Sequence, residues 1–129
     1  MLVVKTFLKE TEDRGIGLFA GEFIPKGKRI WVNEIFFVVD FEKEIIDNLF
    51  PELAKEFLEK YAWTKDGETY HLAIDNERFV NHSETPNVGE NKVDESMVAL
   101  RDIQEGEEIL YNYRDFDLTS ENDLGFEVK

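Results

Sequence analysis

The chain has 129 residues and a formal net charge of −14 at pH 7, from 29 acidic and 15 basic side chains, and it contains no cysteine. This charge would repel nucleic-acid phosphates and anionic membranes, so we expect neither as a direct partner, although the acidity can equally serve solubility alone. Disulfides and thiolate metal sites are excluded, and the length predicts one domain with a hydrophobic core.

The N-terminal run Met1–Lys5 is apolar but carries no basic leader and no small-residue cleavage site, so we expect no signal peptide. No stretch approaches the roughly 20 apolar residues that cross a bilayer. We therefore expect a soluble intracellular protein, cytoplasmic or, if its source is eukaryotic or viral, nuclear.

Short runs of β-branched and aromatic residues recur along the chain, separated by glycine and proline turns. They predict strands at residues 2–8, 28–39 (one or two strands), 69–74, 97–101 and 108–113. The one clear helix, at about residues 51–62, begins at Pro51 and has an apolar face made of Leu53, Ala54, Phe57, Leu58 and Tyr61. Many short strands with one inserted helix indicate a mostly-β domain.

Three short blocks carry residues that packing alone does not explain. They are residues 14–20 (Arg-Gly-Ile-Gly-Leu-Phe-Ala), residues 78–87 (beginning Arg-Phe-Val-Asn-His-Ser and ending Pro-Asn) and residues 106–113 (Gly-Glu-Glu-Ile-Leu-Tyr-Asn-Tyr). The pair Asn81-His82 is a poor space filler, because both side chains need hydrogen bonds when buried. The second block therefore predicts a tight, polar and functional bend.

In this order, the three blocks resemble the SET domain family of protein lysine methyltransferases. The resemblance covers nearly the whole chain and implies a SET-type β-clip fold, with several short-stranded sheets and a C-terminal pseudoknot formed by the second and third blocks. It implies one domain over residues 1–129, with a variable insert at about 40–68. The tail, residues 114–129, is acidic but keeps apolar residues, so we expect it to fold back on the domain.

The resemblance also implies a cofactor, S-adenosylmethionine, whose product is S-adenosylhomocysteine. Backbone groups of the glycine block would hold the amino-acid end, and Asn81 and His82 would contact the methionine part and the adenine. The expected cofactor contacts are Gly15, Ile16, Gly17, Leu18, Tyr70, Arg78, Phe79, Asn81, His82, Tyr113 and Phe116. By residue type alone, the glycines also fit an ordinary turn, Asn81-His82 a polar turn that braces the pseudoknot, and Arg78 an ion pair with local acids.

Tyr113 stands where the family has its catalytic tyrosine, and Tyr111 where the family has Phe or Tyr. The implied reaction moves a methyl group from a sulfonium to a lysine ε-amine. A free lysine has a pKa near ~10.4, so an apolar channel and the sulfonium charge must favour the neutral amine, and neither effect needs a general base. Tyr113 would orient the amine, while the Tyr111 hydroxyl would limit room for further methyl groups, which leans toward mono- or dimethylation. By pattern alone, Tyr113 also fits a core tyrosine at a strand end.

Without cysteine, the chain lacks the zinc-binding post-SET cluster of histone-specific relatives, and the sequence predicts no metal site. Phe116 and Phe126 are the candidates to close the site instead, or else they pack as ordinary tail residues. The short insert resembles minimal members of the family, so we expect a monomer or a homodimer.

The leading hypothesis is transfer of a methyl group from S-adenosylmethionine to a lysine of a basic protein, such as a histone or histone-like protein. The alternative is a non-catalytic SET/β-clip module that binds basic partners. A third hypothesis, an acidic scaffold that masks basic proteins, uses only the net charge. Cofactor binding separates the first hypothesis from the other two.

Overall fold

The structure is a computed structural model that describes residues 1–114 and residue 129. Over these residues the strands are short: β1 (Thr6–Glu10), β2 (Ile16–Ala20), β3 (Arg29–Trp31), β4 (Val38–Glu42), β5 (Thr69–Ala73), β6 (Asn81–His82), β7 (Val88–Asn91), β8 (Ser96–Ala99) and β9 (Leu110–Tyr111). The helices are α1 (Lys43–Leu49) and α2 (Glu52–Tyr61), with 3-10 turns at Ile35–Phe37 and Asn76–Phe79. The predicted mostly-β class is confirmed.

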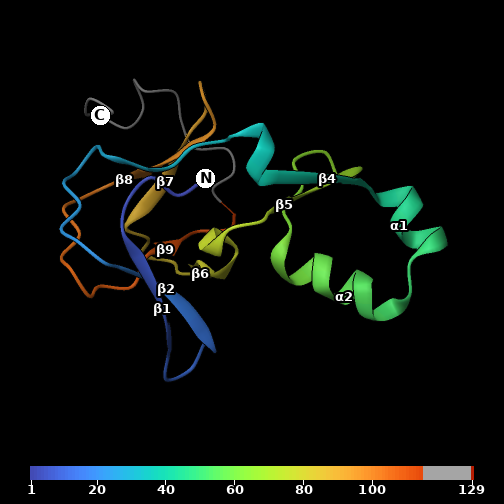
Figure 1. Cartoon of the computed structure of the whole chain (residues 1–129), viewed down its shortest axis with the longest axis horizontal. Coiled ribbons are helices and arrows are strands. Elements are labelled where there is room, and N and C mark those ends of the chain that lie inside the picture. The colour runs from blue at the N-terminus through green and yellow to red at the C-terminus, as the bar shows by residue number, and fades with distance from the viewer. Residues whose placement is uncertain (115–128) are drawn as a thin grey trace.

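In the described part of the chain, the strands form four small sheets. β1 pairs antiparallel with β2, β4 pairs antiparallel with β5, and β3, β8 and β7 form an antiparallel three-stranded sheet. β6 and β9 pair in parallel, which joins the second sequence block to the third. Figure 1 shows β1, β2 and β6 to β9 gathered at one end of the molecule and the β4–β5 hairpin with both helices at the other.

One hydrophobic core holds these small sheets together. Its buried members are Leu18, Ala20, Ile24, Ile30, Trp31, Ala73, Val80, Val88, Met97, Ala99, Ile103, Ile109 and Tyr111. Burial of one large apolar side chain stabilises a fold by about 1.5–3 kcal/mol. Two-stranded sheets are marginal by themselves, so this shared core is what makes them stable.

The segment between β4 and β5 contains two helices, whereas the sequence predicted one. The predicted helix is confirmed as α2, with Pro51 as its N-cap, but α1 was missed. α1 has only seven residues, too few for a clear periodic pattern, and it ends because the residue before Pro51 is held in an extended conformation.

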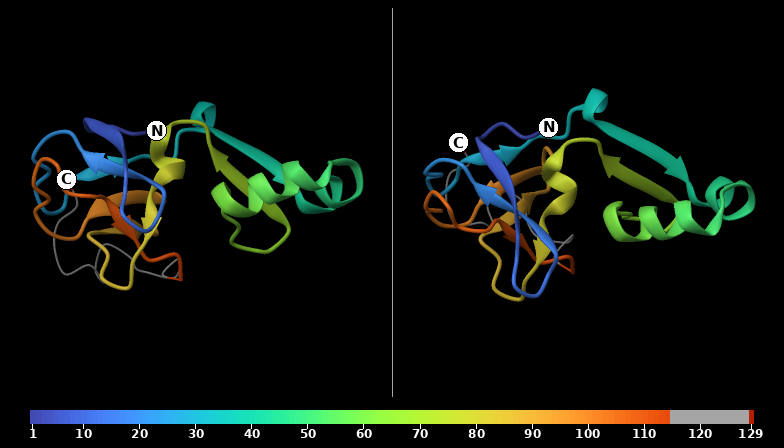
Figure 2. Two further views of the ribbon diagram at one scale, coloured as in Figure 1. Left: turned by 90° about the horizontal axis from the view of Figure 1, so that it is seen from below. Right: turned by 60° about the horizontal axis from the view of Figure 1, so that its bottom comes forward.

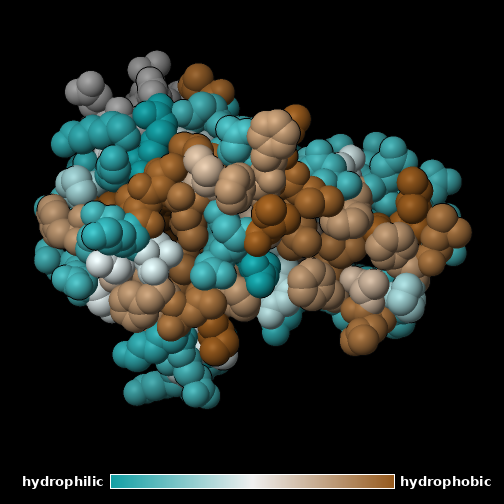
Figure 3. Space-filling model, viewed as in Figure 1, coloured by the Kyte–Doolittle hydropathy of each residue, from teal (hydrophilic) through white to brown (hydrophobic). Residues whose placement is uncertain are grey.

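The hairpin and its helices extend away from the other sheets (Figures 1 and 2). The predicted apolar face of α2 is only partly covered, because Leu58 is buried while Leu53 is 77% exposed. Hydrophobic side chains therefore gather on the surface at this end of the molecule (Figure 3). Neither helix, nor any other in the described residues, is long and apolar enough to cross a membrane.

Several predicted strand positions were displaced or missed. The strand predicted at residues 2–8 is β1 at Thr6–Glu10, and Leu2 instead forms a bridge with Trp31. The strand predicted at 97–101 is β8, and the one at 108–113 shortens to β9. β7 was missed because its sequence, Val-Gly-Glu-Asn, has weak strand propensity and is held by pairing and burial.

The last residue, Lys129, lies beside the start of β3. Its N–H donates to the carbonyl of Gly27 (2.6 Å), and its carbonyl accepts from the N–H of Arg29 (3.0 Å). Residues 115–128 lie outside the described part of the chain, so folding back of the whole tail stays a prediction.

The buried side chain of Asn87 locks the second block onto the third. Its Nδ2 donates to the carbonyl of Glu108 (2.8 Å), and its Oδ1 accepts from the N–H of Leu110 (2.8 Å). Asn87 is fully buried, so no water replaces these bonds if the amide is lost.

Asn87→Ala should therefore destabilise the protein by roughly 2–4 kcal/mol, because two backbone groups lose their partner in the interior. Urea unfolding measures this loss. Asn48→Ala, on the exposed surface of α1 with one bond to the carbonyl of Glu44, is the matched control and should change stability little. Equal effects of the two substitutions would contradict the assignment.

Candidate functional site

The glycine block forms the turn from β1 into β2. Gly15 has φ +71°, a left-handed conformation that favours glycine, and its carbonyl accepts from the N–H and the hydroxyl of Thr11, both at 2.7 Å. Position 17 also requires glycine, but for a steric reason. A Cβ there would lie 2.7 Å from Glu108 Oε2 and 3.1 Å from Asn81 Nδ2. Side chains of the other two blocks thus pass directly over Gly17.

Asn81 connects all three blocks. Its Nδ2 donates to the carbonyl of Ile16 (3.2 Å) and to Glu108 Oε2 (3.0 Å). The other carboxylate oxygen of Glu108 lies 3.4 Å from Arg14 Nη1. The Asn81 amide therefore fixes the position of the glycine strand relative to the third block.

His82 positions Tyr113. Its Nδ1 accepts from the backbone N–H of Tyr113 (3.1 Å), and its Nε2 lies 3.2 Å from Glu84 Oε1. Because Nδ1 accepts, the proton of the neutral ring is on Nε2, where it donates to Glu84. The two aromatic rings also contact, with centroids 5.2 Å apart. Both ring nitrogens are therefore engaged in hydrogen bonds.

The Tyr113 hydroxyl donates to the carbonyl oxygen of Val80. Burial, followed by the nearby charges of Glu77 and Glu108, raises the pKa of Tyr113 above its ordinary value. Tyr113 is therefore a neutral phenol at physiological pH; its O–H donates a hydrogen bond to the Val80 carbonyl, and the lone pairs of its oxygen can accept from a further donor.

A cleft of about 280 Å³ lies beside Tyr113, and we call it the tyrosine cleft. Its wall includes Tyr61, Trp63, Arg78, Val80, Tyr111 and Tyr113. The Arg78 Nη1 donates to the carbonyl of Asp75 (2.9 Å), and its guanidinium lies 4.6 Å from the centre of the Phe79 ring. The side chain is thereby held at the cleft by neutral groups.

This lining fits the groups of S-adenosylmethionine. Aromatic faces stack on a purine and attract a positive sulfonium. An arginine is a suitable partner for the cofactor's carboxylate.

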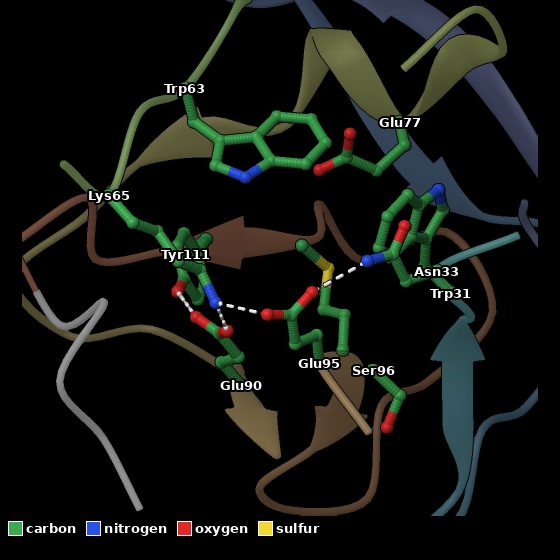
Figure 4. Close-up of a pocket in the computed structure, with 10 residues that line it drawn as sticks. Trp31, Asn33, Trp63, Lys65, Glu77, Glu90, Glu95, Ser96 and Tyr111 are labelled. Atoms are coloured by element: carbon green, nitrogen blue, oxygen red, sulfur yellow. Dashed lines mark hydrogen bonds and ion pairs between the residues drawn. The ribbon is translucent and has the colours of Figure 1, made fainter. Parts of the chain in front are cut away.

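A smaller cavity of about 60 Å³ shares Trp63, Glu77 and Tyr111 with the tyrosine cleft, and we call it the tryptophan cavity. Figure 4 shows its residues: the rings of Trp31 and Trp63 lie edge to face, 5.9 Å apart between centroids.

On the opposite wall of the tryptophan cavity, Lys65 Nζ binds Glu90 Oε1 (2.8 Å) and Glu95 Oε1 (3.0 Å) (Figure 4). The Tyr111 hydroxyl donates to Glu90 Oε2 (3.4 Å). The Lys65 ammonium is therefore bound in this cavity, and the Glu90 carboxylate links it to the Tyr111 hydroxyl.

Most of the predicted site residues come together. Arg78, Tyr111 and Tyr113 line the tyrosine cleft, and hydrogen bonds join Asn81 to Ile16 and His82 to Tyr113. Their contacts with a cofactor stay predictions.

Other predicted residues lie elsewhere. The Leu18 side chain is fully buried in the core, so only its backbone faces the third block, where its carbonyl accepts from Ile109. Phe79 packs edge to face on Tyr61, with centroids 5.7 Å apart. Tyr70 lies on β5, in register with Phe41 of β4 in the insert hairpin. Phe116 and Phe126 fall outside the described residues.

Sequence reasoning missed Glu77, Glu108 and the two tryptophans. In the sequence, nothing distinguishes Glu77 and Glu108 from the other members of a set of 29 acidic residues. Only their contacts across the fold do so. The chain has two tryptophans, and Trp63 directly follows the predicted helix. This position is a sequence signal that could have marked Trp63 as a candidate site residue.

Glu77 gives a pH-dependent stability prediction. Burial, followed by the Asp75 carboxylate, raises the pKa of Glu77 from 4.5 to about 7. The folded state therefore binds this proton more tightly than the unfolded state. The resulting penalty is absent below pH 4.5, grows as pH rises toward about 7, and is complete above it.

Glu77→Gln removes the penalty, so at pH 8 the variant should be more stable than the wild type by on the order of 3 kcal/mol. At pH 4 the two proteins should be nearly equal. Urea unfolding at both pH values measures the difference. A difference that does not change with pH would show that Glu77 titrates normally.

Comparisons with known proteins show the family to which the chain belongs. The model of the SET domain family matches residues 15–114. The variant-silencing SET domain-containing protein of Plasmodium falciparum is 33% identical over 120 residues; the match covers 82% of this chain and 5% of that protein, so the chain spans a small part of its relative.

Two solved structures share the fold. A Plasmodium falciparum protein assigned as a histone methyltransferase has a TM-score of 0.59 and 23% identity, over 85% of this chain and 93% of that chain. The Neurospora SET domain protein DIM-5, a histone lysine methyltransferase, has a TM-score of 0.61 and 20% identity, over 87% of this chain and 53% of that chain. The family model matches most of the chain and includes all three connected blocks except Arg14, and the chain belongs to the SET domain family.

Proposed function

We propose that this chain transfers a methyl group from S-adenosylmethionine to the ε-amine of a lysine in a protein substrate. The observation that carries the proposal is the position of Tyr113, whose hydroxyl is held on the Val80 carbonyl at the wall of the tyrosine cleft. Membership of the SET domain family supports the same reaction.

The cofactor would supply a methyl group on a sulfonium. In the proposal, Arg78 holds its carboxylate, and the backbone at residues 15–17 together with Asn81 holds the rest of the amino-acid end. His82 keeps Tyr113 in place through the bond between Nδ1 and the Tyr113 N–H.

The residues at the cleft then act on the incoming amine. Tyr113 keeps its own proton because its pKa is raised, so its oxygen accepts a hydrogen bond from the amine N–H. This contact orients the nitrogen lone pair, and orientation of a bound nucleophile contributes several kcal/mol to rate enhancement, up to about 7–11 in model reactions. Carbonyl oxygens such as that of Val80 add weak C–H···O contacts to the methyl group.

The net charge supports a basic substrate. At −14, the chain attracts a lysine that is flanked by further basic residues, as in a histone or histone-like protein. The hydroxyl of Tyr111, on the wall of the tyrosine cleft, would leave less room for further methyl groups on the amine, which supports mono- or dimethylation as the product.

Calorimetric titration with S-adenosylhomocysteine tests the cofactor. We expect one-to-one binding that Asn81→Ala weakens at least about tenfold, because the variant loses the bonds that fix Ile16 and Glu108, each worth roughly 1 kcal/mol or more. Asn48→Ala, far from the cleft on α1, is the control and should bind like the wild type. Folded protein that binds no cofactor would favour the non-catalytic module instead.

Tyr111→Phe tests the product. Without the hydroxyl, which bonds to Glu90 at 3.4 Å, the site gains room beside the amine. We expect the variant to add more methyl groups than the wild type to the same peptide, as read by mass spectrometry. An unchanged product distribution would remove Tyr111 from the control of methylation state.

A further inference from the structure

Glu77 has an unusual place in the site. It lies in the 3-10 turn just before Val80, and it lines both the tyrosine cleft and the tryptophan cavity. Of the acidic residues on these two walls, it is the one they share. In Figure 4 its carboxylate points into the space next to the Trp63 ring.

The carboxylate of Glu77 has no hydrogen bond or ion pair within the described part of the chain. The charged and titratable groups around it are the Met1 ammonium, Asp75, Arg78 and Tyr113, with Glu59 and Lys60 on the wall of the tyrosine cleft and Lys65, Glu90 and Glu95 across the tryptophan cavity. Arg78 donates to backbone carbonyls, and Lys65 is taken by Glu90 and Glu95. The Met1 ammonium donates to the Val32 carbonyl and pairs with Asp75 at 3.9 Å, and Lys60 lies over the Tyr61 ring. Among the described residues, the Glu77 carboxylate therefore has no cation in an ion pair with it, which a desolvated carboxylate needs.

The surroundings of Glu77 favour an ammonium group. Three carboxylates face one lysine in the tryptophan cavity, and the rings of Trp31 and Trp63 present faces that attract cations. The chain already contains one example of an ammonium bound in this cavity, because Glu90 and Glu95 bind Lys65.

Other candidate bases at the site are engaged in hydrogen bonds or, like Glu59, line the tyrosine cleft alone. Tyr113 keeps its proton, which forms a hydrogen bond to the carbonyl oxygen of Val80, and both nitrogens of His82 are hydrogen-bonded. The second histidine, His71, is paired with Asp40 in the insert hairpin. Glu77 is the one unpaired carboxylate that faces both cavities, and its pKa of about 7 matches the strength of an effective base near neutral pH.

We propose that Glu77 accepts the proton that the substrate lysine must lose before methyl transfer. The proposal rests on the proposed function and adds a base to a reaction that sequence reasoning left without one. An N–H bond of the ammonium breaks, its electron pair stays on nitrogen, and an O–H bond forms on Glu77. The neutral amine then forms the N–C bond while the C–S electron pair leaves with sulfur. Glu77 returns its proton to water through the cavity.

The first test needs no activity. In protein labelled with ¹³C at the glutamate carboxyl carbons, the Glu77 signal, assigned by its loss in Glu77→Gln, should titrate with a midpoint near 7. Addition of Nα-acetyl-lysine methylamide as a probe should lower that midpoint, because a bound ammonium stabilises the carboxylate. A midpoint near 4.5, or one that the probe leaves unchanged, would overturn the proposal.

The second test is the pH dependence of single-turnover methyl transfer. In the wild type, the rate should rise up to about pH 7 and then level off. In Glu77→Gln it should be lower at pH 7 by roughly 100-fold, the usual contribution of a positioned base, and should rise about tenfold per pH unit beyond. The gap between the two proteins should narrow as pH increases.

Glu44→Gln is the matched control, because it removes the same charge from an exposed position of α1 that lines neither cavity. It should keep the wild-type profile with its step near pH 7. A wild-type profile in Glu77→Gln would overturn the role of Glu77 alone. A wild type that methylates no protein, with or without a titrating Glu77, would instead contradict the proposed function.

Discussion

The parallel pairing of β6 with β9 is the interaction on which the site depends. Parallel strands cannot be joined by a tight turn, so the chain must travel through β7 and β8 before it returns. A pair of two-residue strands is weak, and the buried Asn87 compensates by bonding the backbone at Glu108 and Leu110. Once this pair is fixed, Asn81 lies over Gly17 and Tyr113 lies against His82. The site is thus a consequence of the way in which the chain closes its core.

Burial of charge then gives this site its chemistry. The same enclosure that keeps Tyr113 protonated raises the pKa of Glu77 to about 7, at a cost in stability above that pH. A fold selected only for stability would place a neutral side chain there. A substrate ammonium that enters the site would explain a carboxylate at this position, because the ammonium would offset the desolvation of Glu77 and give up a proton to it.

Much of this arrangement is predictable from sequence, because motif residues have fixed roles. The glycine block, Asn81-His82 and Tyr113 could be found by their resemblance to the motifs of the SET domain family, and α2 by its periodicity. β7 could not, because its pairing with β8 overrides weak local propensity. Glu77 could not either, since an acid acquires a raised pKa only from neighbours brought by folding. Tyr70 resembles a family tyrosine, although its spacing to Asn81-His82 is shorter than in many relatives; it lies on β5, in register with Phe41, and its contact with a cofactor stays a prediction.

The central claim is that the paired blocks hold the Tyr113 hydroxyl where methyl transfer occurs. Single-turnover methylation of a lysine peptide by Tyr113→Phe, with cofactor binding measured on the same sample, tests it most directly. Loss of one preorganised hydrogen bond at a reaction centre lowers the rate by roughly 100-fold, so we predict that decrease with unchanged affinity for S-adenosylhomocysteine. Transfer at the wild-type rate by the folded variant would contradict the account.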